Sequence, residues 1–164
     1  MIAYVVPGYI ILWGLSFLSP EIRWWLTGTE QVQPSIAAFL HITVASVAAG
    51  MTASGFRWAV LDSIHHRTGI HKPNWSDSSL HERIKGYDWL VENHYRYYQF
   101  YANSLISLTV AYGCWRLSPS ASAIGVGVLD IAVLVCFVVF YAGSRNTLDR
   151  YYRRAESLLT EQGE

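Results

Sequence analysis

Long apolar runs that carry almost no charged residues are the feature that most constrains the fold of this chain. Four such runs are predicted transmembrane helices, covering residues 2–18, 36–56, 97–115 and 121–142. The first is the shortest, and its extension through a kink at Pro20 to Leu26 is left open. A helix needs about 20 apolar residues to cross a bilayer. A soluble helix bundle would instead show a polar stripe every 3.6 residues, and the second and fourth runs show none. The sequence therefore predicts an all-α polytopic membrane protein with four transmembrane helices.

The overall composition agrees with this prediction. The 164 residues are 52% hydrophobic and only 15% charged, whereas ordinary globular chains contain about 25% charged residues. A chain of this length is expected to form one unit, so residues 1–164 are predicted to be a single membrane domain. The formal net charge is zero, which argues against direct binding of nucleic acid.

The positive charges are distributed very unevenly over the predicted connections. Four spans place the N-terminus, the loop 57–96 and the tail 143–164 on one side, and that side holds ten of the 12 lysines and arginines. Short cytoplasmic segments are enriched in Lys and Arg. Both termini, the loop and the tail are therefore predicted to be cytoplasmic, the tail as a C-terminal helical extension. The predicted location is a bacterial inner membrane.

Polar residues within the apolar runs predict a polar seam made of His41, Asn103, Ser107 and Asp130. An aspartate near the middle of a span is costly and usually faces a bundle interior or water. Counting along the two runs places His41 and Asp130 at similar depths, so that they could pair. Two interpretations stay open: a seam that lines water, as in a pore, or one that only forms hydrogen bonds between helices.

Small residues recur at intervals of four in the second run, at Ser46, Gly50 and Ser54. This spacing lets two helix backbones approach closely in lipid. The face is predicted either to pack inside one chain or to form an interface between copies in a homo-oligomer.

Four arginines in the predicted tail, Arg145, Arg150, Arg153 and Arg154, form a basic surface. Such a surface can contact anionic membrane lipid. It can equally bind a cytoplasmic protein partner, and both interpretations are kept.

The tyrosines of the segment ENHYRYYQFYAN lie at the start of the third run. Tyr95, Tyr97, Tyr98 and Tyr101 are interpreted as an aromatic belt at the cytoplasmic membrane interface.

Histidines of the cytoplasmic loop raise the question of a metal site. His65, His66 and His71 are the candidate ligands, because imidazole binds several transition metals. However, the HxxHH boxes of integral-membrane di-iron hydroxylases are absent, and so are the Walker A, GxSxG and HExxH motifs. No catalytic residue and no cofactor are therefore predicted, and the chain is expected to be a non-enzyme.

These features favour a small inner-membrane protein that self-associates and acts as a channel-like or membrane-perturbing component. By its size and layout, such a protein could be the membrane arm of a bacterial stress or antiviral defence system. Two alternatives stay open: a membrane-bound, histidine-ligated metalloenzyme that acts on lipid, and a non-catalytic anchor that recruits a soluble partner.

Overall fold

The described part of the chain is all-helical in class, as the sequence predicts, with short turns and irregular segments between the helices. In this computed structural model, the described residues are 2–28, 36–74, 83–122 and 125–160, and none of them forms a strand. The elements are α1 (Ile2–Leu15), α2 (Pro20–Thr27), α3 (Ile36–Phe56), η1 (Arg57–Leu61), α4 (Asp62–Arg67), α6 (Ile84–Leu90), η2 (Val91–Tyr95), α7 (Arg96–Leu117), α8 (Pro119–Ser122) and α9 (Val128–Thr160).

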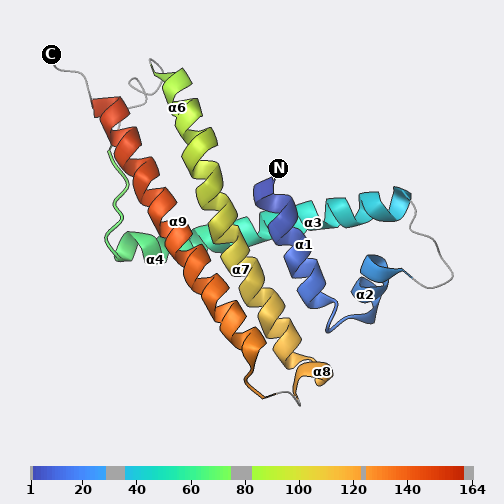
Figure 1. Cartoon of the computed structure of the whole chain (residues 1–164). Coiled ribbons are helices and arrows are strands. Elements are labelled where there is room, and N and C mark those ends of the chain that lie inside the picture. Colours follow the sequence, from blue (N-terminus) through green and yellow to red (C-terminus); the bar gives the residue numbers. More distant parts are fainter. Residues whose placement is uncertain (1, 29–35, 75–82, 123–124, 161–164) are drawn as a thin grey trace.

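Three long helical rods organise these elements. The π-helical segments η1 and η2 join α3 to α4 and α6 to α7 without a break, and α9 forms the third rod by itself. In Figure 1, α7 and α9 lie side by side, while the rod formed by α3, η1 and α4 crosses them. α1 packs against both α3 and α7.

Two helices are long and apolar enough to cross a membrane. They cover Ile36–Arg67 and Val128–Leu159, and only 17% and 6% of their most apolar windows are buried. A core helix of a soluble protein passes the same test of length and composition but is mostly buried, so the exposure of these two helices favours membrane association. α1 is a shorter apolar helix of 14 residues. The four predicted spans are therefore reduced to two candidates among the described residues.

Two predicted spans have different ends in the structure. α1 ends at Leu15, and α2 begins separately at Pro20, where the Ser19 hydroxyl accepts a hydrogen bond from the backbone N–H of Ile22 (3.3 Å). Proline at the first position and serine as the cap are typical of a helix start. At the fourth span, α9 begins at Val128 instead of residue 121.

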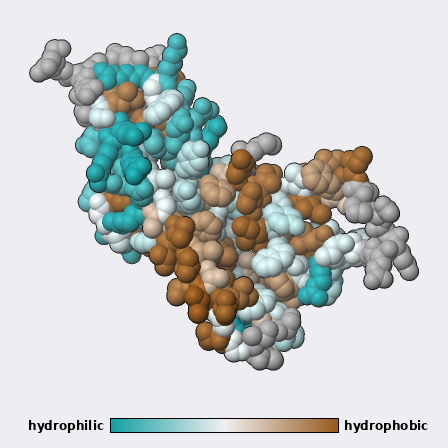
Figure 2. Space-filling model, viewed as in Figure 1, coloured by the Kyte–Doolittle hydropathy of each residue, from teal (hydrophilic) through white to brown (hydrophobic). Residues whose placement is uncertain are grey.

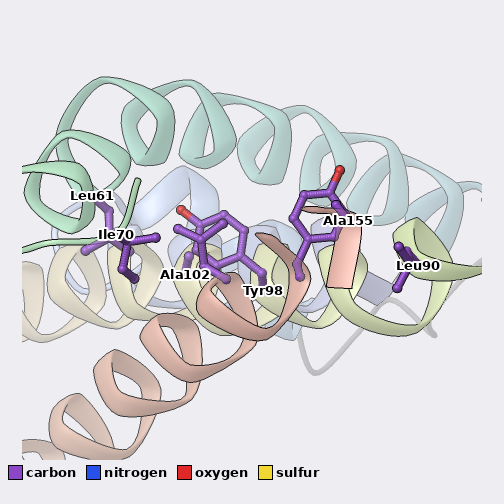
Figure 3. Packing of buried hydrophobic residues seen from close by; sticks show 8 residues of the cluster. Leu61, Ile70, Leu90, Tyr98, Ala102 and Ala155 are labelled. Atoms are coloured by element: carbon purple, nitrogen blue, oxygen red, sulfur yellow. The ribbon is translucent and has the colours of Figure 1, made fainter. Parts of the chain in front are cut away.

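The main buried cluster lies at the hydrophilic end of the molecule. Figure 2 shows hydrophilic side chains over α6 and the C-terminal half of α9, and hydrophobic ones over the N-terminal half of α9. The buried cluster, drawn in Figure 3, contains Leu61, Ile70, Leu90, Tyr98, Ala102, Leu148, Tyr151 and Ala155. We call the parts that surround it, residues 57–70, 84–102 and 144–159, the helical head. The segment predicted as a loop, 57–96, is thus largely helical where it is described.

The predicted small-residue face packs inside the chain, against α1. A Cβ atom added at Gly50 would lie 2.0 Å from the carbonyl oxygen of Tyr4, and one added at Gly8 would lie 1.7 Å from that of Ser46. Ser46 and Gly50 are buried, and Ser54 is half-buried further along α3. Close backbone contact between α1 and α3 therefore accounts for the small residues at Ser46 and Gly50.

Candidate functional site

A buried arginine lies where η1 meets the start of the α7 rod. Arg57 is the first residue of η1 and is only 4% exposed. Its guanidinium carbon lies 5.1 Å from the ring centre of Tyr98 and 5.9 Å from that of Tyr95. A guanidinium this close to an aromatic face is attracted by the ring electrons. π-helical segments are rare and often occur at functional sites, so two of them beside one buried cation define a candidate site.

The arginine is not fully satisfied by hydrogen bonds. Its Nε and Nη1 atoms are buried and have no hydrogen-bond partner among the described residues. Leaving a buried donor unpaired costs about 1–3 kcal/mol, and more for a charged group. Burial of Arg57 therefore lowers the folding stability of the protein, which is unusual for a group with a purely structural role.

Tyr98 connects the arginine to α4. Its ring is fully buried, and its hydroxyl donates a hydrogen bond to Oδ1 of Asp62. One tyrosine thus touches the cation through its face and the carboxylate through its hydroxyl, and this holds α7 and α4 together.

A second buried pair in the head joins His65 to Ser144, with 3.0 Å between Nε2 and Oγ. The Ser144 hydroxyl donates its proton to the carbonyl oxygen of Tyr141 (2.8 Å), so Nε2 of His65 must carry the proton that Ser144 accepts. The other ring nitrogen, Nδ1, then presents a buried lone pair and has no partner among the described residues. Both side chains are fully buried. A serine nucleophile needs access to substrate and a base that takes its proton. Ser144 is buried and donates its proton to a backbone carbonyl, so the pair serves as a structural connection between α4 and α9.

At the surface of the head, a side-chain hydrogen bond connects α9 to η2. Nη1 of Arg154 lies 2.6 Å from Nε2 of His94, so the histidine accepts this hydrogen bond in its neutral form. Partial burial, together with the charges of Arg154 and Arg150, lowers the pKa of His94 below its ordinary value. A second contact joins α6 to α9, with 2.8 Å between the hydroxyls of Tyr87 and Tyr151.

The structure brings together only two of the four residues of the predicted polar seam. Asn103 and Ser107 are buried neighbours on α7: the Asn103 amide donates to the carbonyl oxygen of Ala3 (2.9 Å), and the Ser107 hydroxyl donates to that of Asn103 (2.8 Å). His41 is exposed on α3. Within one chain, Asn103 thus bonds to α1, and Ser107 bonds to the backbone of its own helix.

Asp130 lies in the first turn of α9 because that helix begins at Val128. Its carboxylate accepts hydrogen bonds from the Tyr112 hydroxyl, from Arg116 and from the backbone N–H of Gly127. A carboxylate at the third helical position that bonds back to the start of its helix is a common capping arrangement. The partners of Asp130 are thus at the end of the α7–α9 hairpin instead of on α3 with His41.

Three of the four tail arginines make contacts within the chain. Arg145 donates to Thr68, Arg153 pairs with Asp149, and Arg154 contacts His94. Arg150 is exposed. The tail is an amphipathic helix, as predicted, and its buried face includes Leu148, Tyr151 and Ala155.

The three candidate metal ligands do not form a cluster. His65 is buried with Ser144, the His66 ring lies near Tyr152, and Nδ1 of His71 is 3.2 Å from the carbonyl oxygen of Gly69. Within the ranges given above, no three His, Cys, Asp or Glu side chains come close enough to hold a metal ion.

The sequence did not indicate that Arg57 and Tyr98 are buried together. Arg57 was counted only among the positive charges of the cytoplasmic side, and Tyr98 was interpreted as part of the aromatic belt. A usable signal was present in the spacing of the second run. The small-residue face continues at helical intervals beyond the apolar run, and its buried members are Ser46, Gly50, Ala53, Arg57, Leu61 and His65. Extending that face by three turns would have indicated that Arg57 and His65 are buried.

Comparisons with known proteins add no family to this description. No protein-family model matches the chain, and neither the curated proteins nor the solved structures compared with it give a match.

Proposed function

We propose that the protein is an integral membrane protein without a catalytic site, which self-associates in the bilayer and perturbs it. The observation that carries this proposal is the exposed apolar surface of α9. Between Val128 and Val139, its large exposed side chains are Val128, Leu129, Ile131, Leu134, Val135, Val138 and Val139. Contiguous exposed apolar patches of this kind mark contacts with a membrane or with another protein. Lipid acyl chains would cover this surface, while the helical head stays in water on the cytoplasmic side.

Self-association is supported by the outer face of α3 and its continuation. The face that carries Ser46 and Gly50 is occupied by α1, but a second row of small residues is exposed: Ala48, Thr52, Gly55 and Ala59. Their spacing of four, three and four residues is that of one helix face. A Cβ atom at Gly55 would meet nothing within 4 Å. Small residues at this spacing are typical of helix pairs in lipid.

In this proposal, the channel-like activity requires more than one copy of the chain. Asn103 and Ser107 are fully buried within one chain, Asn103 with a hydrogen bond to α1 and Ser107 with one to the backbone of α7. A path for ions would then run along the contact between protomers. Ion flux through liposomes that contain the purified protein measures this directly.

The native cysteines provide a test of membrane embedding. Cys136 is exposed on the apolar part of α9, whereas Cys114 is buried. In a Cys114→Ser background, Cys136 should resist a membrane-impermeant maleimide in intact vesicles and react after denaturation in SDS. Cysteine placed at Ser157, which is exposed on the head, is the matched control in a Cys136→Ser background. It should react only in inside-out vesicles. Rapid labelling of Cys136 in intact vesicles of both orientations would refute membrane embedding.

Self-association is tested by filling the small-residue face. Gly55→Leu should convert oligomers to monomers in mild detergent, measured by light scattering, while Gly55→Ala keeps the face small and should leave the oligomer intact. A wild-type protein that is strictly monomeric in detergent and in liposomes would contradict the proposal.

A bacterial stress or antiviral defence system is the biological setting that we propose. Cells that express the protein would lose membrane potential on phage infection, and Gly55→Leu would abolish this loss. Unchanged membrane potential and unchanged phage plating in the wild type would argue against this setting.

A further inference from the structure

One face of α9 changes from apolar to charged where the apolar surface of the molecule ends. In chain order this face carries Ile131, Val135, Val138, Ala142, Arg145 and Asp149. The steps between them are four, three, four, three and four residues, so they form one straight stripe along the helix. The first four side chains are exposed, and Figure 2 shows the same change from hydrophobic to hydrophilic along α9.

The stripe leads into a shallow hollow of about 440 Å³. One wall is the turn at Gly69 and Ile70 that follows α4. The other wall belongs to α9 and consists of Ala142, Arg145, Asn146, Asp149 and Arg153. The hollow thus has an apolar entrance and a polar end with two guanidinium groups.

Arg145 is held in place at this hollow. Its Nη1 and Nη2 atoms donate hydrogen bonds to Oγ1 and to the carbonyl oxygen of Thr68, at 2.5 and 2.8 Å. A guanidinium has five N–H groups, so these two bonds leave three for another acceptor. Its position is fixed before any ligand arrives, which lowers the entropic cost of binding an anion.

Arg153 is paired with Asp149, with 2.7 Å between Nη2 and Oδ2. Two arginines and one aspartate give the hollow a net charge of +1. Nε of Arg153 also donates to Oδ1 of Asp149 (3.1 Å), so the pair is bidentate, and a phosphate at Arg153 has to compete with the Asp149 carboxylate. Arginine suits phosphate because its planar donors match two phosphate oxygens at once.

We propose that this face binds an anionic glycerophospholipid, with its phosphate between Arg145 and Arg153 and an acyl chain along Ile131–Ala142. The continuous apolar stripe favours a lipid over free phosphate, since free phosphate would leave that stripe uncovered. The inference rests on the proposed membrane embedding, because only then does the apolar part of α9 meet lipid. A second hollow, lined by Trp58, Ala59, Asp62, Ser63 and His66, contains a carboxylate and no arginine and is not suited to an anion.

Binding is measured on the full-length protein, extracted in neutral detergent and stripped of lipid. Four probes are added separately: short-chain phosphatidylglycerol, short-chain phosphatidylcholine, glycerol phosphate and inorganic phosphate. The apparent affinity is read from native mass spectrometry and from the shift in thermal unfolding. We expect phosphatidylglycerol to bind most tightly, since it alone combines an acyl chain with a net negative headgroup.

Three variants separate this site from general attraction to the basic tail. Arg153→Gln should weaken the binding of phosphatidylglycerol about fivefold, as expected for one charge near a membrane surface. Asp149→Asn should strengthen it by a similar factor, because it frees Arg153. Arg150→Gln removes the same charge from an exposed position outside the hollow, and it should leave the affinity unchanged.

Three outcomes would overturn the lipid site. The first is equal binding of phosphatidylglycerol and phosphatidylcholine, and the second is equal weakening by Arg150→Gln and Arg153→Gln. The third is binding of free phosphate as tight as that of phosphatidylglycerol, which would leave the stripe without a role. Labelling of Cys136 reports on membrane embedding separately, so an embedded protein with any of these outcomes refutes the lipid site alone.

Discussion

A charged side chain buried without full hydrogen bonding costs folding free energy, and Arg57 is such a side chain. None of the ion pairs found among the described residues includes it, and two of its nitrogens lack partners. Its aromatic neighbours, Tyr95 and Tyr98, recover part of the cost through their ring faces.

Replacing Arg57 by methionine should therefore leave stability unchanged or raise it. The substitution keeps the length of the side chain but removes a buried charge, two of whose nitrogens have no hydrogen-bond partner among the described residues. Tyr98→Phe is the contrasting variant, because it takes from Asp62 its hydrogen-bond donor and should cost about 1 kcal/mol. Thermal unfolding in detergent measures both. A large loss of stability in Arg57→Met would mean that the cation itself holds the two π-helical segments together.

The contact between His94 and Arg154 should weaken in acid. Because the pKa of His94 is lowered in the folded protein, the unfolded chain binds a proton first, near the ordinary value of about 6.5. The stabilising effect of neutral His94 is complete above that pH and is lost as the pH falls through the lower, folded pKa. The protection factors of amides in η2 and the C-terminal part of α9, which correct for the pH dependence of intrinsic hydrogen exchange, should therefore be lower at pH 5.5 than at pH 7.5.

His94→Gln is the control for this pH effect, since glutamine keeps a hydrogen-bond acceptor but does not titrate near neutral pH. The loss of protection in acid should be smaller in this variant. An identical loss of protection in both proteins would assign the effect to other groups.

At the scale of the helices, the contact between α1 and α3 leaves no space at its centre. Gly50→Ala should cost on the order of 3 kcal/mol, since the new Cβ would overlap the backbone of Tyr4. Gly113→Ala is the matched control, because nothing lies within 4 Å of a Cβ at that position. Alanine should there stabilise helix α7 by about 0.5–1 kcal/mol. Chemical or thermal unfolding in detergent distinguishes the two, and equal effects would contradict the observed contact.

The helices themselves were largely predictable, because each apolar run has helical length and few breakers. The residues at which the helices begin and end were less predictable. α9 starts at Val128, directly after Gly125 and Gly127, two residues that disfavour a helix, and the hydrophobicity of that segment hid the interruption. Asp130 was consequently expected in the middle of a span, whereas it caps α9 and pairs with Arg116.

At the scale of the whole molecule, α9 belongs to both ends of the structure. Its C-terminal half contributes Leu148, Tyr151 and Ala155 to the buried cluster of the head. Removing the chain after Arg145 should therefore unfold the head, and limited proteolysis should then cleave within residues 84–102. Leu148→Ala should have a smaller effect of the same kind, about 2–5 kcal/mol. Arg150→Gln is the exposed control. Resistance to protease in the truncated protein would show that the head folds without α9.

The candidate site was harder to predict than the fold, because it depends on contacts between distant segments. Arg57, Tyr98 and Ser144 come from three different rods, and nothing in the local sequence of one rod indicates the others. Asn103 and Ser107 were found by their spacing on one helix, which is a local property. Their partners could not be predicted in the same way, because the Asn103 amide donates to the Ala3 carbonyl of α1, a segment 100 residues away in the chain.

In the proposed membrane protein, the start of α9 would also affect the surrounding bilayer. From Val128 to Ala142 the helix has 15 residues, or about 23 Å at 1.5 Å per residue, whereas the hydrocarbon core of a bilayer is about 30 Å thick. A span that is too short thins the bilayer nearby, at a cost that grows with each ångström of mismatch. Copies that gather share one thinned region. We therefore expect clustering to increase as the acyl chains of the host lipid are lengthened, which energy transfer between labelled copies in liposomes can measure.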